Sequence, residues 1–148
     1  MSERRIDIDA LEDFLGNEPN VVLATLFGSS SNGFVSPGSD IDIAILYHDP
    51  PEPMEEFEYY YNCLCDVTED IAPISLVNLN SAEPILAFEA LRGRFICRND
   101  LSGAAEFQSL TCRMYEDVMG NLERQRRLRR QDAEWGDRSD RSAERIDS

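Results

Sequence analysis

The sequence of 148 residues contains no lysine and only one histidine, His48. All 14 of its basic residues are arginines, and 29 acidic residues bring the formal net charge to −15. A chain this acidic repels the phosphates of free nucleic acid, whose binding requires clustered cations, so we expect no free nucleic-acid ligand. The acidity also suits a very salty cytoplasm, where salt screens charge repulsion, and we expect a halophilic source.

The cysteines provide no pattern for a zinc site. They make no Cys-x-x-Cys pair, and no histidine lies near them, whereas structural zinc sites need such ligands at short spacing. In a reducing cytoplasm, small buried thiols are the better interpretation. The four residues concerned are Cys63, Cys65, Cys97 and Cys112.

Long apolar runs are also missing. No stretch of 18 apolar residues exists, so we expect no membrane-spanning helix and no membrane partner. The first residues carry no apolar segment typical of a signal peptide, and we expect a cytoplasmic protein. The length suits one domain with a proper core, which we assign to residues 1–130. Residues 131–148 hold one tryptophan, one isoleucine and otherwise small or polar residues, which predicts a disordered charged tail.

Hydrophobic periodicity predicts alternating helices and strands. Apolar residues at helical spacing indicate helices, and short apolar runs between turn signals indicate strands. The order of elements predicts an α/β (α+β) domain, a small mixed β-sheet flanked by helices and followed by a long C-terminal helix. We expect helices over 6–15, 52–70, 83–91 and 103–130, strands over 21–27, 41–47, 74–79 and 94–98, and a loop over 32–38.

The stretch from the first predicted strand to the second carries the candidate site. The strand 21–27 runs into Gly28-Ser29, and ten residues later come Asp40 and Asp42. Two carboxylates at positions i and i+2 of a strand point to the same face. A Gly-Ser turn that starts a helix offers backbone N–H groups to an anion. The pattern therefore predicts a site for a nucleoside triphosphate and its Mg²⁺, because Mg²⁺ prefers one or two carboxylates together with phosphate oxygens and water.

A structural role for the same residues is the alternative. Gly-Ser turns are common, and Ser39-Asp40 would also suit the cap of a turn. The second carboxylate decides between the two interpretations. Asp42 is followed by Ile43-Ala44-Ile45-Leu46, and a pair of carboxylates at the edge of a core is costly unless a cation lies near. The cation and nucleotide site is therefore the stronger hypothesis.

A dense basic run lies near the C-terminal end of the last predicted helix. It suits a solvated helix end, where cations favour the helix dipole, or a contact with an acidic partner protein. RNA is the weaker alternative, because residues 1–123 carry 23 acidic residues against six arginines. Tyrosines 59–61 are divided between the core and an exposed surface, and we assign no catalytic role to His48. The run consists of Arg124, Arg126, Arg127, Arg129 and Arg130.

The spacing Gly28-Ser29, ten residues, Asp40-Ile41-Asp42 resembles the G-S-x10-D-x-D signature of minimal nucleotidyltransferases in the polymerase-beta-like superfamily. The resemblance extends over about residues 5–130. This arrangement of elements is similar to the antitoxin half of HEPN–MNT toxin–antitoxin pairs. It implies transfer of AMP from ATP to a tyrosine of a HEPN ribonuclease toxin, which is thereby silenced. It also implies that Gly28 and Ser29 bind the triphosphate and that Asp40 and Asp42 hold Mg²⁺.

One departure from that family concerns the third predicted strand. Where the family places a third carboxylate, this chain has Ser75, and a serine hydroxyl is not a general base. Asp66 and Asp70 lie nearby in sequence and are candidate substitutes. Three hypotheses follow. The first is an AMP-transferring antitoxin of weak activity, the second an antitoxin that acts by binding its toxin, and the third, less favoured, a nucleotidyltransferase for a small molecule.

Overall fold

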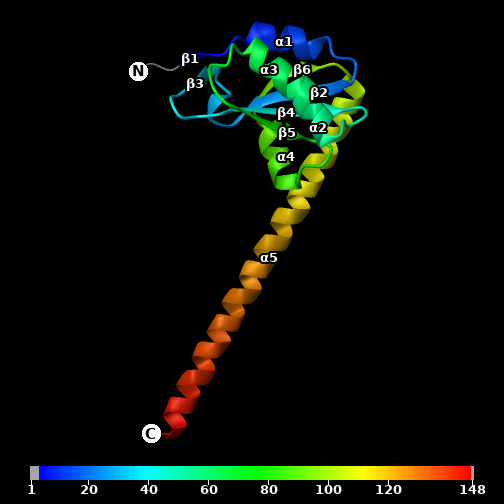
Figure 1. Cartoon of the computed structure of the whole chain (residues 1–148). Helices are drawn as coiled ribbons and strands as arrows, with labels where there is room; N and C mark the ends of the chain where they lie inside the picture. The colour runs from blue at the N-terminus through cyan, green and yellow to red at the C-terminus, as the bar shows by residue number, and fades with distance from the viewer. Residues whose placement is uncertain (1–3, 148) are drawn as a thin grey trace. The chain divides into compact units, whose positions relative to one another are not determined.

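The computed structural model describes the backbone of residues 4–147 and the side chains of residues 4–133. The chain divides into two compact units, one ending at Cys112 and the other beginning at Arg113, and each is described by itself. The first unit contains the sheet, and the second is formed by the continuation of the last helix (Figure 1).

The first unit is organised around a mixed four-stranded sheet. Its strands are β2 (Val21–Phe27), β4 (Ile41–Tyr47), β5 (Ile74–Asn78) and β6 (Arg94–Arg98), in the order β5-β4-β2-β6. Strand β2 pairs antiparallel with β4 and β6, whereas β4 and β5 are parallel. All seven residues of β2 are buried, as a continuous apolar run between two covered faces predicts. The predicted mixed sheet is confirmed.

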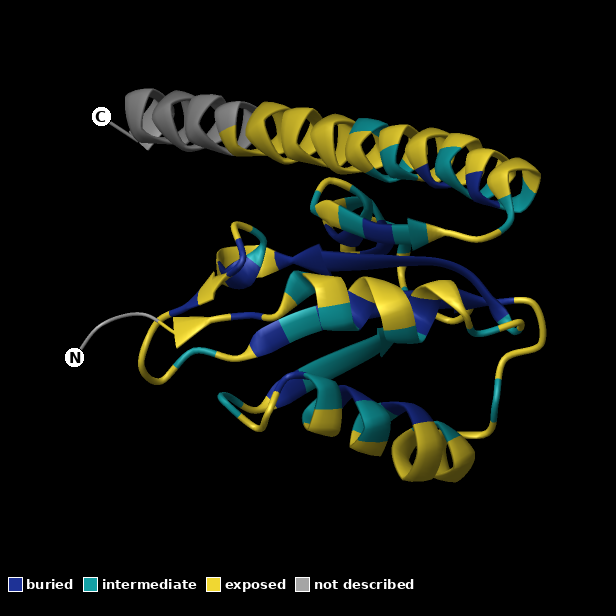
Figure 2. Cartoon of the chain, turned by 90° about the horizontal axis from the view of Figure 1, so that it is seen from above, coloured by how far each residue is buried: buried dark blue, intermediate teal, exposed yellow. Residues whose placement is uncertain are grey.

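Helices cover both faces of this sheet. On one face, α1 (Ile8–Gly16) and α3 (Asn62–Val67) contribute Leu11, Leu15 and Leu64 to one core cluster. On the other face, α4 (Pro84–Leu91) and the start of α5 (Leu101–Asp147) contribute small alanines to a second cluster. Figure 1 shows α1 and α3 above the sheet and α4 below it. Figure 2 shows the buried residues concentrated in the central strands β2 and β4, with exposed residues on the outer sides of the helices. The residues of the edge strands β5 and β6 are mostly of intermediate burial.

Two short elements escape sequence-based prediction. The strand β1 (Arg4–Arg5) pairs antiparallel with β3 (Phe34–Val35), inside the segment 32–38 that was expected to be a loop. Two-residue strands are too short to show alternation, so only the pairing reveals them. The backbone N–H of Ile6 also donates to the carbonyl of Gly33 at 2.8 Å, which fastens this N-terminal segment beside the candidate site.

The predicted helix 52–70 is a broken helical run. It consists of α2 (Pro53–Glu56), a π-helical turn labelled η2 (Phe57–Tyr61) and α3, which ends at Val67. The chain then leaves the helix through Glu69 and Asp70, which have φ values of 56° and 51°. Hydrophobic spacing does not distinguish a single wide turn from regular α-helix, because the apolar stripe continues through both.

The last helix, α5, runs from Leu101 to Asp147. It begins earlier than the predicted residue 103, because the Asp100 carboxylate accepts a hydrogen bond from the Gly103 N–H at 3.0 Å and caps its first turn. It also extends beyond the predicted end near residue 130. Side chains of 134–148 lie outside the described residues, so the disordered tail and the boundary at residue 130 stay predictions.

Within the part of the chain that the structure describes, no helix is both long and apolar enough to span a membrane. The cytoplasmic location and the halophilic source stay predictions.

Candidate functional site

The candidate site lies where β2 ends and β4 begins. Phe27, the last residue of β2, pairs with Asp42 of β4, and Gly28 follows at once with a φ of 70°. A Cβ placed on Gly28 would collide with Oδ2 of Asp42. This position therefore needs glycine for two reasons, its left-handed backbone and the carboxylate that occupies the space of a side chain.

The Gly-Ser turn is a short 3-10 helix, η1 (Gly28–Ser30). The sequence predicts a Gly-Ser turn that starts a helix, and the helix found here is a single turn, whose hydrogen bonds end with the Ser31 N–H donating to the Gly28 carbonyl at 3.3 Å. The cause is local, because the next turn closes on Gly33, whose N–H donates to the Ser30 carbonyl at 2.9 Å. Ser29, like Gly28, is exposed at the end of β2.

Asp42 and Asp40 repel one another at this edge. Asp42 is half-buried on β4, and Asp40 is exposed just before the strand. Partial burial raises the pKa of Asp42, the negative charge of Asp40 raises it further, and a hydrogen bond from Ser75 opposes the shift. A bound cation relieves both the desolvation and the repulsion. The electrostatics thus match the predicted metal-binding role of the two carboxylates.

Ser75 lies directly beside Asp42. In the parallel pairing of β4 and β5, residue 42 is opposite residue 75, and the Ser75 hydroxyl donates to the Asp42 side chain. The position at which the related family carries a third carboxylate therefore faces the site in this chain too. Its occupant is a neutral group that orients Asp42 and adds no charge.

The two candidate substitutes do not complete the site. Asp66 lies on α3, and Asp70 follows that helix. Among the residues that the structure describes, no three His, Cys, Asp or Glu side chains are grouped so as to hold one metal ion. A site of two carboxylates still suits Mg²⁺, which keeps several water ligands and binds phosphate oxygens. Asp40 and Asp42 fit that ion, and the absence of a side chain at Gly28 leaves room for the Asp42 carboxylate.

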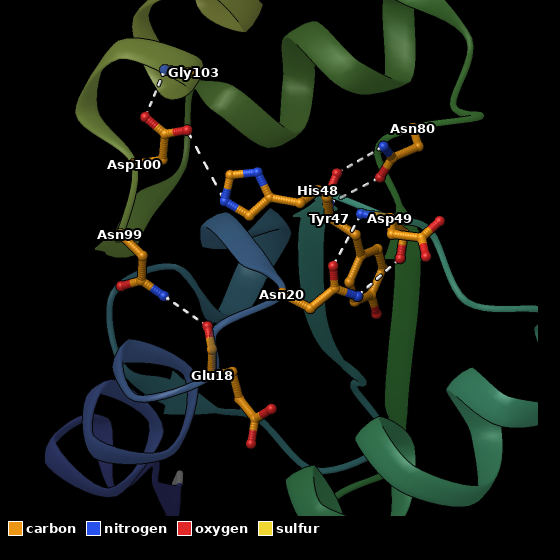
Figure 3. A network of polar contacts seen from close by, with 9 residues as sticks. All are labelled: Glu18, Asn20, Tyr47, His48, Asp49, Asn80, Asn99, Asp100 and Gly103. Atoms are coloured by element: carbon orange, nitrogen blue, oxygen red, sulfur yellow. Dashed lines mark hydrogen bonds and ion pairs between the residues drawn. The ribbon is translucent and has the colours of Figure 1, made fainter.

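The opposite end of β4 carries a different polar cluster. The Asn20 side chain bonds both the N–H and the carbonyl of Asp49, at 2.9 and 2.8 Å. Asn80 does the same for Tyr47, with both distances 2.9 Å. His48 points toward Asp100, with 3.9 Å between Nε2 and Oδ2 (Figure 3). This cluster joins strand ends, far along β4 from Asp42, and sequence patterns gave no signal for it.

The cysteines differ from the prediction of buried thiols. Cys63, Cys65 and Cys97 are only partly buried, and Cys112 is exposed. All four are free thiols. Burial raises the pKa of Cys97 to about 11, which keeps that thiol protonated and unreactive at neutral pH.

The fold is consistent with that of a nucleotidyltransferase. Residues 9–102, more than half of the chain, match the family described as polymerase beta, nucleotidyltransferase. The chain belongs to that family. No curated protein matches it.

Solved structures extend the likeness. The chain is similar to a toxin–antitoxin structure with AMP-PNP, at 25% identity and a TM-score of 0.66, covering 80% of this chain and 94% of that one. It is also similar to the MntA–HepT toxin–antitoxin, at 25% identity and a TM-score of 0.56, covering 78% and 86%. A complex of a tri-AMPylated Shewanella oneidensis HEPN toxin with its MNT antitoxin shares the fold, at 23% identity and a TM-score of 0.59, covering 78% and 92%. The resemblance to minimal nucleotidyltransferase antitoxins is confirmed.

Proposed function

We propose that this protein is an antitoxin that transfers AMP from ATP to a tyrosine of a cognate HEPN ribonuclease toxin and thereby neutralises it. The observation that carries the proposal is the contact of Gly28 with Asp42, beside Asp40, at the end of β2. It joins a phosphate-binding turn to a pair of carboxylates that repel one another until a cation binds. Membership of the nucleotidyltransferase family and similarity to toxin–antitoxin structures support the proposal.

Each residue has a defined part in this proposal. Gly28 and Ser29 bind the triphosphate, since glycine allows close approach of the backbone and serine adds a hydroxyl. Asp40 and Asp42 hold Mg²⁺, which when bound neutralises charge on the phosphates. Ser75 holds Asp42 in place through its hydrogen bond.

The same Ser75 makes turnover slow in this proposal. An acceptor tyrosine must lose its phenol proton, and its ordinary pKa is about 10. A carboxylate at position 75 would accept that proton, whereas a serine hydroxyl does not act as a base near neutral pH. We therefore expect tight binding of Mg-ATP and a low rate of AMP transfer.

The test is transfer of label from ATP to the cognate HEPN toxin. Wild type with Mg²⁺ is compared with Asp40→Asn/Asp42→Asn. Asp66→Asn/Asp70→Asn serves as the control, because it also removes two acidic charges and lies outside the site. We expect label on a toxin tyrosine with wild type and with the control, and none with the double variant. Equal labelling by wild type and the double variant would reject the assignment of the two aspartates.

An antitoxin that acts by binding alone is the second candidate, and Ser75 is the observation that favours it. In that case the double variant still forms the complex and still inhibits the ribonuclease. Inhibition that disappears together with labelling rules this candidate out and supports AMP transfer.

A further inference from the structure

A small cavity borders the candidate site on the β5 side. Its volume is about 290 Å³, and Asp40 forms part of its lining. Its apolar lining comes from Val35 and Pro37 on one side and from Ile71 and Pro73 on the other. These two segments lie immediately before β4 and β5, the strands that carry Asp42 and Ser75.

The walls of this cavity are tied to the site. The N–H of Ile41, between the two aspartates, donates to the carbonyl of Pro73 at 2.9 Å. Val35 is held by its pairing with Arg4 across β3 and β1, and Arg4 also lines the cavity. The position of the cavity relative to Asp40 is thus determined by backbone hydrogen bonds on both sides.

Size and chemistry indicate what the cavity takes. Pockets for whole small molecules have volumes of about 300–1,000 Å³, so this cavity is too small for a nucleoside triphosphate and suits a single side chain. An apolar wall with Asp40 and Arg4 among the polar residues of its lining fits a group with an apolar body and a polar tip, as tyrosine has.

Two further cavities of the described residues are lined by neither aspartate. One of about 470 Å³ is lined by Arg5, Gly33 and Arg94, among others. Another of about 330 Å³ lies by His48 and Phe107. Of these cavities, the one at Asp40 alone is placed to present a ligand atom to a phosphate held there.

We propose that this cavity is the acceptor subsite, which receives the ring of the tyrosine to be modified; this inference rests on the proposed function. The phenol oxygen attacks the α-phosphorus of ATP and forms the new O–P bond. The bond from that phosphorus to the bridging oxygen breaks, pyrophosphate leaves, and the phenol proton passes to water. Arg4 favours the phenolate, because a nearby positive charge stabilises an anion. This compensates in part for the missing base at position 75.

The first experiment fills the cavity. Ala72, which is half-buried and lines the cavity, is replaced by phenylalanine. Ala82→Phe is the matched control, because Ala82 is also half-buried but lies outside the three cavities. We expect Ala72→Phe to raise KM for the toxin at least tenfold with an unchanged Kd for Mg-AMP-PNP, and Ala82→Phe to change neither. A wild-type KM for a folded Ala72→Phe overturns the inference.

Arg4→Gln provides a second variant, since Arg4 is exposed on a surface strand and its replacement spares the core. We expect a several-fold lower kcat near pH 7 that recovers as the pH approaches the phenol pKa, and rescue by Arg4→Lys. A loss that is the same at every pH overturns the role of Arg4.

A binding measurement separates this inference from the proposed function. N-acetyltyrosinamide is titrated into protein loaded with Mg-AMP-PNP, and the signals of residues 35 and 71–73 are followed by NMR. Shifts in wild type that are lost in Ala72→Phe support the subsite even if the toxin is never labelled, an outcome that refutes AMP transfer alone. No shift in wild type overturns the subsite.

Discussion

Strand β4 begins beside Asp42 and ends beside His48, and polar side chains surround these two ends in opposite ways. At the far end, Asn20 and Asn80 satisfy the backbone of Asp49 and Tyr47 with paired hydrogen bonds. At the near end, Asp42 and Asp40 repel one another and only a neutral hydroxyl supports them. Satisfied polar groups stabilise the fold, whereas like charges held together require a ligand. The end of β4 with Asn20 and Asn80 therefore stabilises the fold, whereas the end with Asp40 and Asp42 is suited to binding a ligand.

The largest expected effect comes from filling the space at Gly28. Gly28→Val should reduce Mg-ATP affinity and AMP transfer at least a hundredfold, because its side chain would displace the Asp42 carboxylate. Gly38→Val is the control for nucleotide binding alone, because Gly38 lines the proposed acceptor subsite. Gly38 also has a positive φ, of 81°, but its Cβ would meet nothing within 4 Å. Calorimetric titration with Mg-AMP-PNP measures the difference, and equal losses in both variants would attribute the effect to backbone strain alone.

Removing the Asn80 side chain, at the end of β4 away from Asp42, should lower the stability of the fold and leave AMP transfer unchanged. Asn80→Ala deletes both hydrogen bonds to Tyr47 and should cost about 1–2 kcal/mol of unfolding free energy, since it leaves part-buried backbone groups unpaired. Asn80→Asp keeps the acceptor for the Tyr47 N–H and should cost less. Urea unfolding gives the free energies, and a large change in AMP transfer at native conditions would contradict the division between the ends.

Neutralising Asp42 should raise the stability of the metal-free protein, in contrast to the loss expected for Asn80→Ala. Because its pKa is raised in the folded state, protonation is favoured by folding, and the metal-free protein loses stability as the pH rises from the ordinary value of 3.8 through the raised pKa. Asp42→Asn should remove this loss and therefore raise Tm by a few degrees at pH values above that range. Thermal unfolding in EDTA between pH 3.5 and 7 tests this. Identical profiles of Tm against pH for wild type and Asp42→Asn would show that folding does not raise the pKa of Asp42.

The smallest effect is expected at Ser75. Ser75→Ala removes one hydrogen bond to Asp42 and should weaken Mg-ATP binding several-fold. Ser75→Asp should restore a carboxylate that can accept the phenol proton, and should raise kcat for AMP transfer about tenfold. Steady-state kinetics with the toxin measure both, and a slower Ser75→Asp enzyme would indicate that the added negative charge outweighs the gain of a base.

Sequence patterns identified the main strands well. The predicted bounds of β2, β4 and β6 agree with the structure, because each is an apolar run closed by glycine, proline or charged residues. They failed where no local period exists, as in β1 and β3, which form only through their mutual pairing. They also failed at the π-helical turn of 57–61, which hydrophobic spacing cannot distinguish from regular helix.

The sequence by itself determined which residues form the candidate site, since Gly28-Ser29 and Asp40-x-Asp42 carry a recognisable spacing. Only the tertiary structure decided that Asp42 fills the space beside Gly28 and that Ser75 bonds to it. It also separated Asp66 and Asp70 from the site and formed the cavity at Asp40. The physical reason is that periodicity and turn chemistry act within a few residues, whereas the register of β4 on β5 joins side chains more than thirty residues apart.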